Sequence, residues 1–243
     1  MTTPRYFDWS ALDRDLLIEM LTISASQFVN KVYTPSALTK RIRDQFNFFG
    51  VPLKFKTEKG YETGLNEVWV GGLYDGISDK KGLKPITIQV QYNPDAKKIV
   101  LSKGKFYRIA RLIADTVLHE VIHARQFRRR KYKIIPGYTS TAELSKQRKE
   151  QTYLGHNDEI DAYSFNIACQ LSDMFRGNKK EIVNYLNRDL NDKRLKKNSY
   201  KMYLDAFNHN HSHTVIKKLK KKVIYYLSYV ELGKPYKTSD WLK

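Results

Sequence analysis

The feature that most constrains this chain is a pair of histidines placed four residues apart inside an apolar segment, residues 117–124 (VLHEVIHA). Positions i and i+4 of a helix share one face, so the imidazoles of His119 and His123 can bind a single metal ion. Glu120 directly follows the first histidine. Its carboxylate would then lie at the edge of the site, where it can accept a proton from water without binding the metal. The segment therefore predicts a metal-dependent hydrolytic site on a helix.

The apolar pattern around these histidines predicts a long helix from about Phe106 to Arg128 that runs through the middle of a domain. Burying His119, Glu120 and His123 in such a helix costs several kcal/mol unless a metal or hydrogen bonds compensate. This cost favours a site. Asp115 lies one turn before His119 and is a candidate to orient a metal-bound imidazole. An exposed helix acid is the ordinary alternative for Asp115.

The residues before this helix predict a small, mostly antiparallel sheet. Residues 51–56, 68–70, 86–92 and 99–101 read as short strands separated by turns. Two helices are expected earlier in the chain, one over about 10–32 and one that begins at Thr34-Pro35 and ends before Gly50. A strand beside a metal site can offer its free edge to an extended peptide through main-chain hydrogen bonds.

A metal site that acts on a substrate needs a third protein ligand besides the two histidines. The candidates are Glu159 and His156, at the start of a predicted helix with Asn157 as its cap. A carboxylate at the start of a packed helix has the better-fixed geometry, although an acid stabilised by the helix dipole is the ordinary reading of Glu159. The residue that does not bind the metal could stabilise an oxyanion, a task that Tyr153 or Tyr163 could share.

Residues 116–124 (TVLHEVIHA) are similar to the active-site helix of zincin metallopeptidases, and LHEVIHA resembles the SprT and Spartan-like branch. Residues 159–163 (EIDAY) resemble the second helix of gluzincin-type enzymes, including phage-encoded and ImmA-like members, in which a glutamate completes the metal site. The resemblance implies a zinc-dependent endopeptidase that acts on a protein substrate. His119, His123 and Glu159 would bind Zn²⁺, and Glu120 would be the catalytic base.

The sequence departs from both family patterns. SprT-like proteins usually have a third histidine after a shorter interval, and Tyr163 stands where gluzincins have an aspartate four residues after the glutamate. The similarity covers about residues 86–171, so the first helices and the C-terminal part lie outside it.

The charge of the chain points to anionic partners. The 44 Lys and Arg residues against 25 Asp and Glu give a formal charge of +19, which attracts nucleic acid and other polyanions. Three histidines at 209, 211 and 213 are expected to form a polar loop rather than a second metal site. Two basic clusters are candidate nucleic-acid contacts, with solvated helix ends as the ordinary alternative: Arg128, Arg129, Arg130, Lys131, Lys217, Lys218, Lys220, Lys221 and Lys222.

Together these patterns predict an α+β fold with a zincin-like domain over residues 1–176 and a basic helical extension over 177–243. Cys169 is the only cysteine, which excludes an intrachain disulfide. No signal peptide and no apolar run of roughly 20 residues is present, so we expect a cytoplasmic or virion-associated protein without a membrane contact. The alternative to a protease is a structural or nucleic-acid-binding protein, of a virion type, that keeps a zincin fold without proteolysis.

Overall fold

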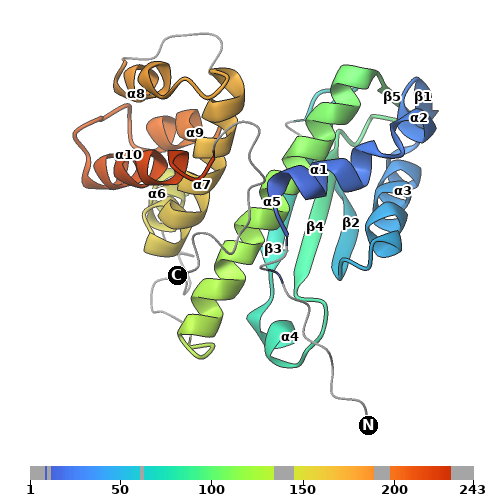
Figure 1. Ribbon diagram of the computed structural model, residues 1–243, viewed down its shortest axis with the longest axis horizontal. Helices are drawn as coiled ribbons and strands as arrows, with labels where there is room; N and C mark the ends of the chain where they lie inside the picture. Colours follow the sequence, from blue (N-terminus) through green and yellow to red (C-terminus); the bar gives the residue numbers. More distant parts are fainter. Residues whose placement is uncertain (1–8, 10–11, 61–62, 134–144, 189–197, 231–243) are drawn as a thin grey trace. The chain divides into compact units, whose positions relative to one another are not determined.

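The computed structural model describes residues 9, 12–60, 63–133, 145–188 and 198–230, and it has the predicted α+β class (Figure 1). The chain divides into two compact units, Met1–Tyr132 with Lys237–Lys243, and Lys133–Tyr236. The structure thus divides after Tyr132, whereas the sequence predicted a boundary after residue 176. The helix that carries Glu159 is grouped with the C-terminal helices.

The first unit begins with α1 (Arg14–Thr22), α2 (Ala25–Phe28), β1 (Lys31–Tyr33) and α3 (Pro35–Phe48). The prediction of one helix over 10–32 is wrong, because this stretch contains two short helices and a strand. Asn30 has a φ of 61°, a left-handed conformation that does not continue a helix. The predicted start of α3 is confirmed, because the Thr34 side chain accepts a hydrogen bond from the Ala37 amide and Pro35 is the first helical residue.

The main sheet of the first unit has the strand order β2 (Leu53–Lys59), β4 (Ile86–Tyr92), β3 (Trp69–Tyr74). β3 pairs antiparallel with β4, but β2 pairs parallel with it. The sheet is therefore mixed rather than mostly antiparallel, because successive strands alternate in direction while β4 lies between β2 and β3. β5 (Ile99–Leu101) pairs antiparallel with β1, the strand that the sequence analysis missed.

The long helix α5 (Lys103–Arg129) packs on β3, on β4 and on α1 (Figure 1). Ser102 caps it through a hydrogen bond from the Lys105 amide to the Ser102 hydroxyl. Ile109, Ile113 and Val117 on its apolar face are almost fully buried. The prediction of a helix over about 106–128 is confirmed. A short helix, α4 (Gly76–Lys80), lies between β3 and β4 in the chain, where only a loop was expected.

The second unit is helical in its described part, with α6 (Lys146–Leu154), α7 (Asn157–Met174), α8 (Lys179–Asn187), α9 (Ser199–Ala206) and α10 (Thr214–Leu227). The sequence predicts a helix over about 214–232 with one apolar stripe. α7 and α10 pack against each other, and Ile216, Leu219 and Val223 of this stripe are buried. This packing explains why α7 belongs to the unit of the C-terminal helices. The sequence also predicts a loop at 136–137 and a helix that begins near 141, and both positions lie outside the described residues. The helix that it predicts over about 214–232 ends earlier, because α10 stops at Leu227 with Ser228 as its C-terminal cap.

Within the described part of the chain, no helix has both the length and the apolar composition that crossing a membrane requires.

Candidate metal centre

His119 and His123 lie one turn apart on the same face of α5, as their spacing predicts. Their Nε2 atoms are 3.1 Å apart, and the two side chains are buried. Two ligands of a tetrahedral zinc ion at about 2.0–2.1 Å would be separated by roughly 3.3 Å. The spacing of the two nitrogens therefore fits the binding of one metal ion by both rings.

Gln126 fixes the orientation of the His123 ring. The Nδ1 atom of His123 lies 2.9 Å from the Oε1 atom of Gln126. A carbonyl oxygen only accepts hydrogen bonds, so Nδ1 carries the proton and Nε2 presents its lone pair, the form in which a histidine binds a metal. The sequence analysis missed Gln126, although its position three residues after His123 places it on the same helix face.

Glu120 lies against the backbone of the edge strand β3. A Cβ atom at Gly72 would stand 2.4 Å from Glu120 Oε1 and 2.7 Å from Glu120 Cγ and from Thr116 Cγ2. Only glycine allows the strand to approach the buried carboxylate this closely. Among the described residues, β3 pairs with β4 alone, so its other edge has no strand partner there. The candidate base is therefore adjacent to a strand edge, as the sequence predicts.

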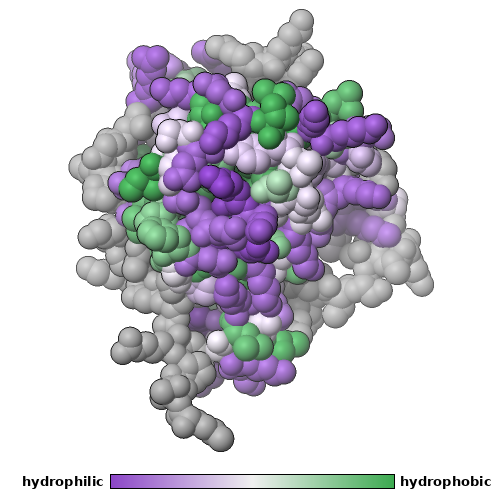
Figure 2. All heavy atoms as spheres, turned by 90° about the vertical axis from the view of Figure 1, so that its right-hand side faces the viewer, coloured by the Kyte–Doolittle hydropathy of each residue, from purple (hydrophilic) through white to green (hydrophobic). Residues whose placement is uncertain are grey.

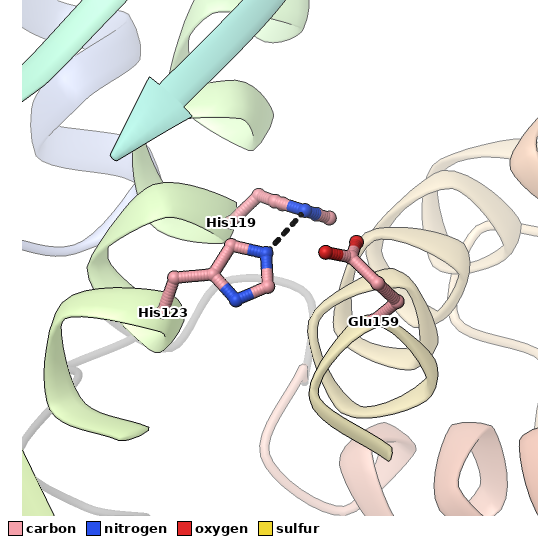
Figure 3. A group of neighbouring side chains, drawn as sticks. All are labelled: His119, His123 and Glu159. Atoms are coloured by element: carbon pink, nitrogen blue, oxygen red, sulfur yellow. Dashed lines mark hydrogen bonds between the residues drawn. The ribbon is translucent and has the colours of Figure 1, made fainter. Parts of the chain in front are cut away.

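Glu159 lies in the first turn of α7 and is 3% exposed. His119, His123 and Glu159 form a group that could hold a metal ion, because one ligand atom from each lies within 4.8 Å of the others. Figure 3 shows the two imidazoles and the carboxylate pointing toward one another. The donors are two imidazole nitrogens and one carboxylate oxygen, a set that occurs in catalytic zinc sites.

His156 is not a member of this group; it caps α7. Its Nδ1 atom accepts a hydrogen bond of 3.3 Å from the Asp158 amide, and Asn157 is the first helical residue. The prediction of Asn157 as the cap is therefore wrong. The Asn157 side chain instead accepts a hydrogen bond from Lys218 on α10.

The hydroxyl of Tyr153 lies close to the side chains of Glu159 and Tyr163, which both act on its electrostatics. Tyr153 is 44% exposed as a residue, but its hydroxyl end is desolvated, and this raises the pKa of Tyr153 above its usual value; the neighbouring Tyr163 and Glu159 raise it further. The hydroxyl therefore stays protonated and can donate a hydrogen bond. Tyr163 in turn meets the ring of Tyr203 edge to face, with centroids 5.6 Å apart.

Asp115 is buried and forms an ion pair with Arg14 from α1, with 2.6 Å between Arg14 Nε and Asp115 Oδ1. The sequence analysis did not identify this partner, because Arg14 lies about a hundred residues earlier in the chain. The predicted role of Asp115 in orienting an imidazole stays a prediction.

The first predicted basic cluster contains an arginine that binds a carboxylate. Arg128 donates from Nε and Nη2 to the two oxygens of Asp79, over 2.7 and 2.5 Å. Arg130 lies over the ring of Phe127, with its guanidinium carbon 4.9 Å from the centroid. Arg129 and Lys131 are exposed. Contact of this cluster with nucleic acid stays a prediction, and Arg128 has a structural role in any case.

The second basic cluster lies on α10, and several of its side chains bond to the protein. Lys222 forms an ion pair with Asp161, and Lys220 lies 2.9 Å from Nδ1 of His211. Lys217, Lys218 and Lys221 are exposed, although Lys218 also bonds to Asn157.

The histidines at 209, 211 and 213 lie in the connection between α9 and α10, so the predicted polar loop is confirmed. His213 caps α10 by accepting a hydrogen bond from the Val215 amide, and His209 lies 3.0 Å from Asp205.

No protein-family model, no curated protein and no solved structure matches this chain. The likeness to zincins therefore rests on the residues of the histidine motif and of the helix that begins at Asn157.

Proposed function

We propose that this chain is a zinc-dependent endopeptidase with a zincin-like arrangement of sheet, histidine helix and glutamate helix. One observation carries the proposal: the buried nitrogens of His119 and His123 converge within 3.1 Å, and Glu159 belongs to the same group. Burying these polar groups together is costly unless something binds them.

Zinc is the metal that suits this donor set best. Two neutral imidazoles and one carboxylate leave a fourth position for water in a tetrahedral site. When bound, zinc would lower the pKa of a water molecule toward about 7 and polarise the carbonyl group of a substrate.

The protein side chains then move protons and hold charge. The carboxylate of Glu120 accepts the proton of the attacking water and returns it to the leaving amine. The protonated hydroxyl of Tyr153, beside Glu159, is the candidate donor to the oxyanion. The edge of β3 that pairs with no described strand suits an extended peptide, which would pair with its backbone next to Glu120.

The metal content of three proteins tests the ligands. We expect one zinc ion per chain in the wild type and in His156→Ala, and loss of zinc in Glu159→Ala, because Glu159 is the proposed third ligand. Elemental analysis after dialysis measures this content. Zinc that is lost from His156→Ala and kept by Glu159→Ala would reverse the assignment of the third ligand.

The Glu120→Gln variant tests the chemistry. It should keep the metal and the fold but hydrolyse an unfolded protein substrate at least about a hundredfold more slowly, because a positioned general base contributes roughly 10²–10⁴-fold. Glu150→Gln, a change at an exposed glutamate of α6, is the matched control and should leave the rate unchanged. Hydrolysis by Glu120→Gln at the wild-type rate would refute the role of Glu120.

The charge of +19 favours a second candidate, a nucleic-acid-binding protein that does not cleave peptides. This second function predicts that the wild-type protein binds DNA with an affinity that falls with salt and that it binds metal. It also predicts that the protein hydrolyses no protein substrate, with or without DNA. A protease that acts near nucleic acid would instead cleave faster when DNA is present.

A further inference from the structure

A pocket of about 390 Å³ lies on the first unit between α3 and the middle of β2. None of the proposed metal ligands lines it. The residues that matter for its chemistry are two cations, an aromatic ring and three hydroxyl groups: Lys40, Arg43, Phe55, Ser36, Thr39 and Thr57.

The cations of this α3–β2 pocket are available to an anion. Lys40 is exposed and makes no hydrogen bond or ion pair with any described residue. Arg43 contacts the neighbouring Asp44 at 3.2 Å, an exposed pair of the kind that contributes little. Lys59 follows Thr57 on the same face of β2 and extends the positive charge along the strand. Figure 2, which faces the side where α3 lies in Figure 1, shows a mainly hydrophilic surface.

The aromatic ring of the pocket, Phe55, packs against a second ring. Phe55 stacks against the buried Phe46, with centroids 5.6 Å apart and an angle of 27° between the planes. Thr39 is fixed by a hydrogen bond of 2.9 Å with the Tyr92 hydroxyl. The hydroxyls of Ser36 and Thr57 are exposed and can bond to a ligand. An aromatic surface beside cations and hydroxyls is the combination that binds a base together with its phosphates.

We propose that the α3–β2 pocket binds one nucleotide of single-stranded nucleic acid. The base lies on Phe55, and Lys40 and Arg43 contact the flanking phosphates. The volume falls in the roughly 300–1,000 Å³ range of small-ligand pockets, which suits one unstacked nucleotide rather than a duplex. The charge of +19 draws a polyanion to this surface. The proposal does not depend on the metal site.

The affinity of the full-length protein for a short fluorescein-labelled oligothymidylate tests the cations. Anisotropy titrations at several salt concentrations should show that Lys40→Gln/Arg43→Gln weakens binding at least about tenfold. The slope of log K against log salt should become shallower by about 1.4, since each lost contact to single strands contributes about 0.7. The matched control, Lys80→Gln/Lys81→Gln at exposed lysines of α4 and its cap, removes the same charge. Equal binding by the two double variants would overturn the proposal.

The Phe55→Leu variant tests base stacking. It should weaken binding about five- to a hundredfold without changing the salt slope, because stacking involves no phosphate. Melting curves of each variant establish that it is folded. If Phe55→Leu fails to fold, the comparison of Lys40→Gln/Arg43→Gln with the control Lys80→Gln/Lys81→Gln still tests the proposal.

Competition experiments identify the source of the nucleotide. Unlabelled oligothymidylate should displace the probe, whereas thymidine monophosphate and a duplex of the same length should compete at least about tenfold less well. Displacement by the free nucleotide at the same concentration as by the oligomer would overturn single-stranded nucleic acid as the ligand. Equal competition by the duplex would overturn the proposal that an unpaired base stacks on Phe55.

Discussion

At the scale of single residues, the candidate metal centre depends on side chains that hold the ligands in one orientation. Gln126 is such a positioning residue, because its oxygen selects the tautomer of His123 whose Nε2 can bind a metal. A histidine that is not held in its metal-binding orientation binds the metal with lower affinity.

We predict that Gln126→Leu lowers the zinc affinity about 10–100-fold, the usual effect of removing a hydrogen-bond partner of a ligand. Gln126→Glu keeps an acceptor oxygen and should restore the affinity. Competition with a fluorescent zinc chelator measures both variants. Wild-type affinity in Gln126→Leu would show that the hydrogen bond to His123 has no part in metal binding.

Gly72 is the second residue whose identity follows from the site. We predict that Gly72→Ala reduces the proposed peptide hydrolysis more than tenfold, because its Cβ atom would stand 2.4 Å from the carboxylate of Glu120, the proposed base, and force Glu120 or β3 to move. The rate on an unfolded protein substrate measures this effect, with zinc content as a check on the metal site.

Gly71→Ala is the matched control for Gly72→Ala. The Cβ atom at residue 71 would come closest to the side-chain oxygen of Gln89, at 3.3 Å, and a flexible side chain can withdraw. Its next contacts, Gln91 Nε2 and Gln89 Cβ, lie at ordinary distances of 3.6 and 3.9 Å. This variant should keep most of its activity. Equal loss of activity in the two variants would show that any side chain added to β3 disturbs the strand. The loss in Gly72→Ala would then not be due to the contact with Glu120.

The sequence could predict those parts of the site that depend on contacts between residues close together in the chain. His119 and His123 are fixed by helix geometry alone, and Gln126 could have been found by the same rule. The sequence favoured Glu159 over His156 as the third ligand by ligand type and position alone, because both residues stand at the start of one helix. The capping bond from the Asp158 amide to His156 separates them, and it depends on where α7 begins.

At the scale of elements, a buried carboxylate joins α4 to the end of α5. Asp79 receives hydrogen bonds from Arg128 and from the hydroxyls of Tyr74 and Tyr132. Burial alone would raise the pKa of Asp79, but the hydrogen bonds from Arg128 and Tyr74 outweigh it and hold this pKa below its ordinary value.

We predict that Asp79→Ala lowers the free energy of unfolding by about 2–3 kcal/mol at neutral pH, somewhat less than a fully buried pair because Arg128 is partly exposed. A lowered pKa means that this stabilisation is complete above the ordinary aspartate pKa and is lost as the pH falls below about 4. Urea unfolding should show that the difference in the free energy of unfolding between the wild type and Asp79→Ala is smaller at about pH 3 than at about pH 7. Asp44→Ala, at an exposed carboxylate, should change stability little at either pH.

The elements divide into those that local patterns predict and those that depend on distant partners. α5 and α10 are predicted well because a long apolar face of helical period leaves no alternative. β1 was missed because three residues carry no period, and the strand exists only by pairing with β5. The parallel pairing of β2 with β4 depends on the order of the strands, which alternation within one strand does not encode.

At the scale of the whole molecule, composition and packing give different divisions of the chain. The density of basic residues rises beyond Gly177, and this change suggested a boundary after residue 176. α7 nevertheless buries its apolar residues against α10, so the packed unit starts at Lys133. Surface charge reports the partners of a protein, whereas buried contacts decide which helices fold together.

We predict that removing metal destabilises the molecule as a whole, because a ligand that binds only the folded state adds RT ln(1 + [L]/Kd), about 2.7 kcal/mol at a hundredfold excess over Kd. For a chain of this size that corresponds to a fall in Tm of roughly 5–10 °C with a chelator. Zinc should reverse the fall and magnesium should not. Glu120→Gln should keep the full shift and His119→Ala should lose it. A chelator that leaves the wild-type Tm unchanged would contradict a metal at this centre.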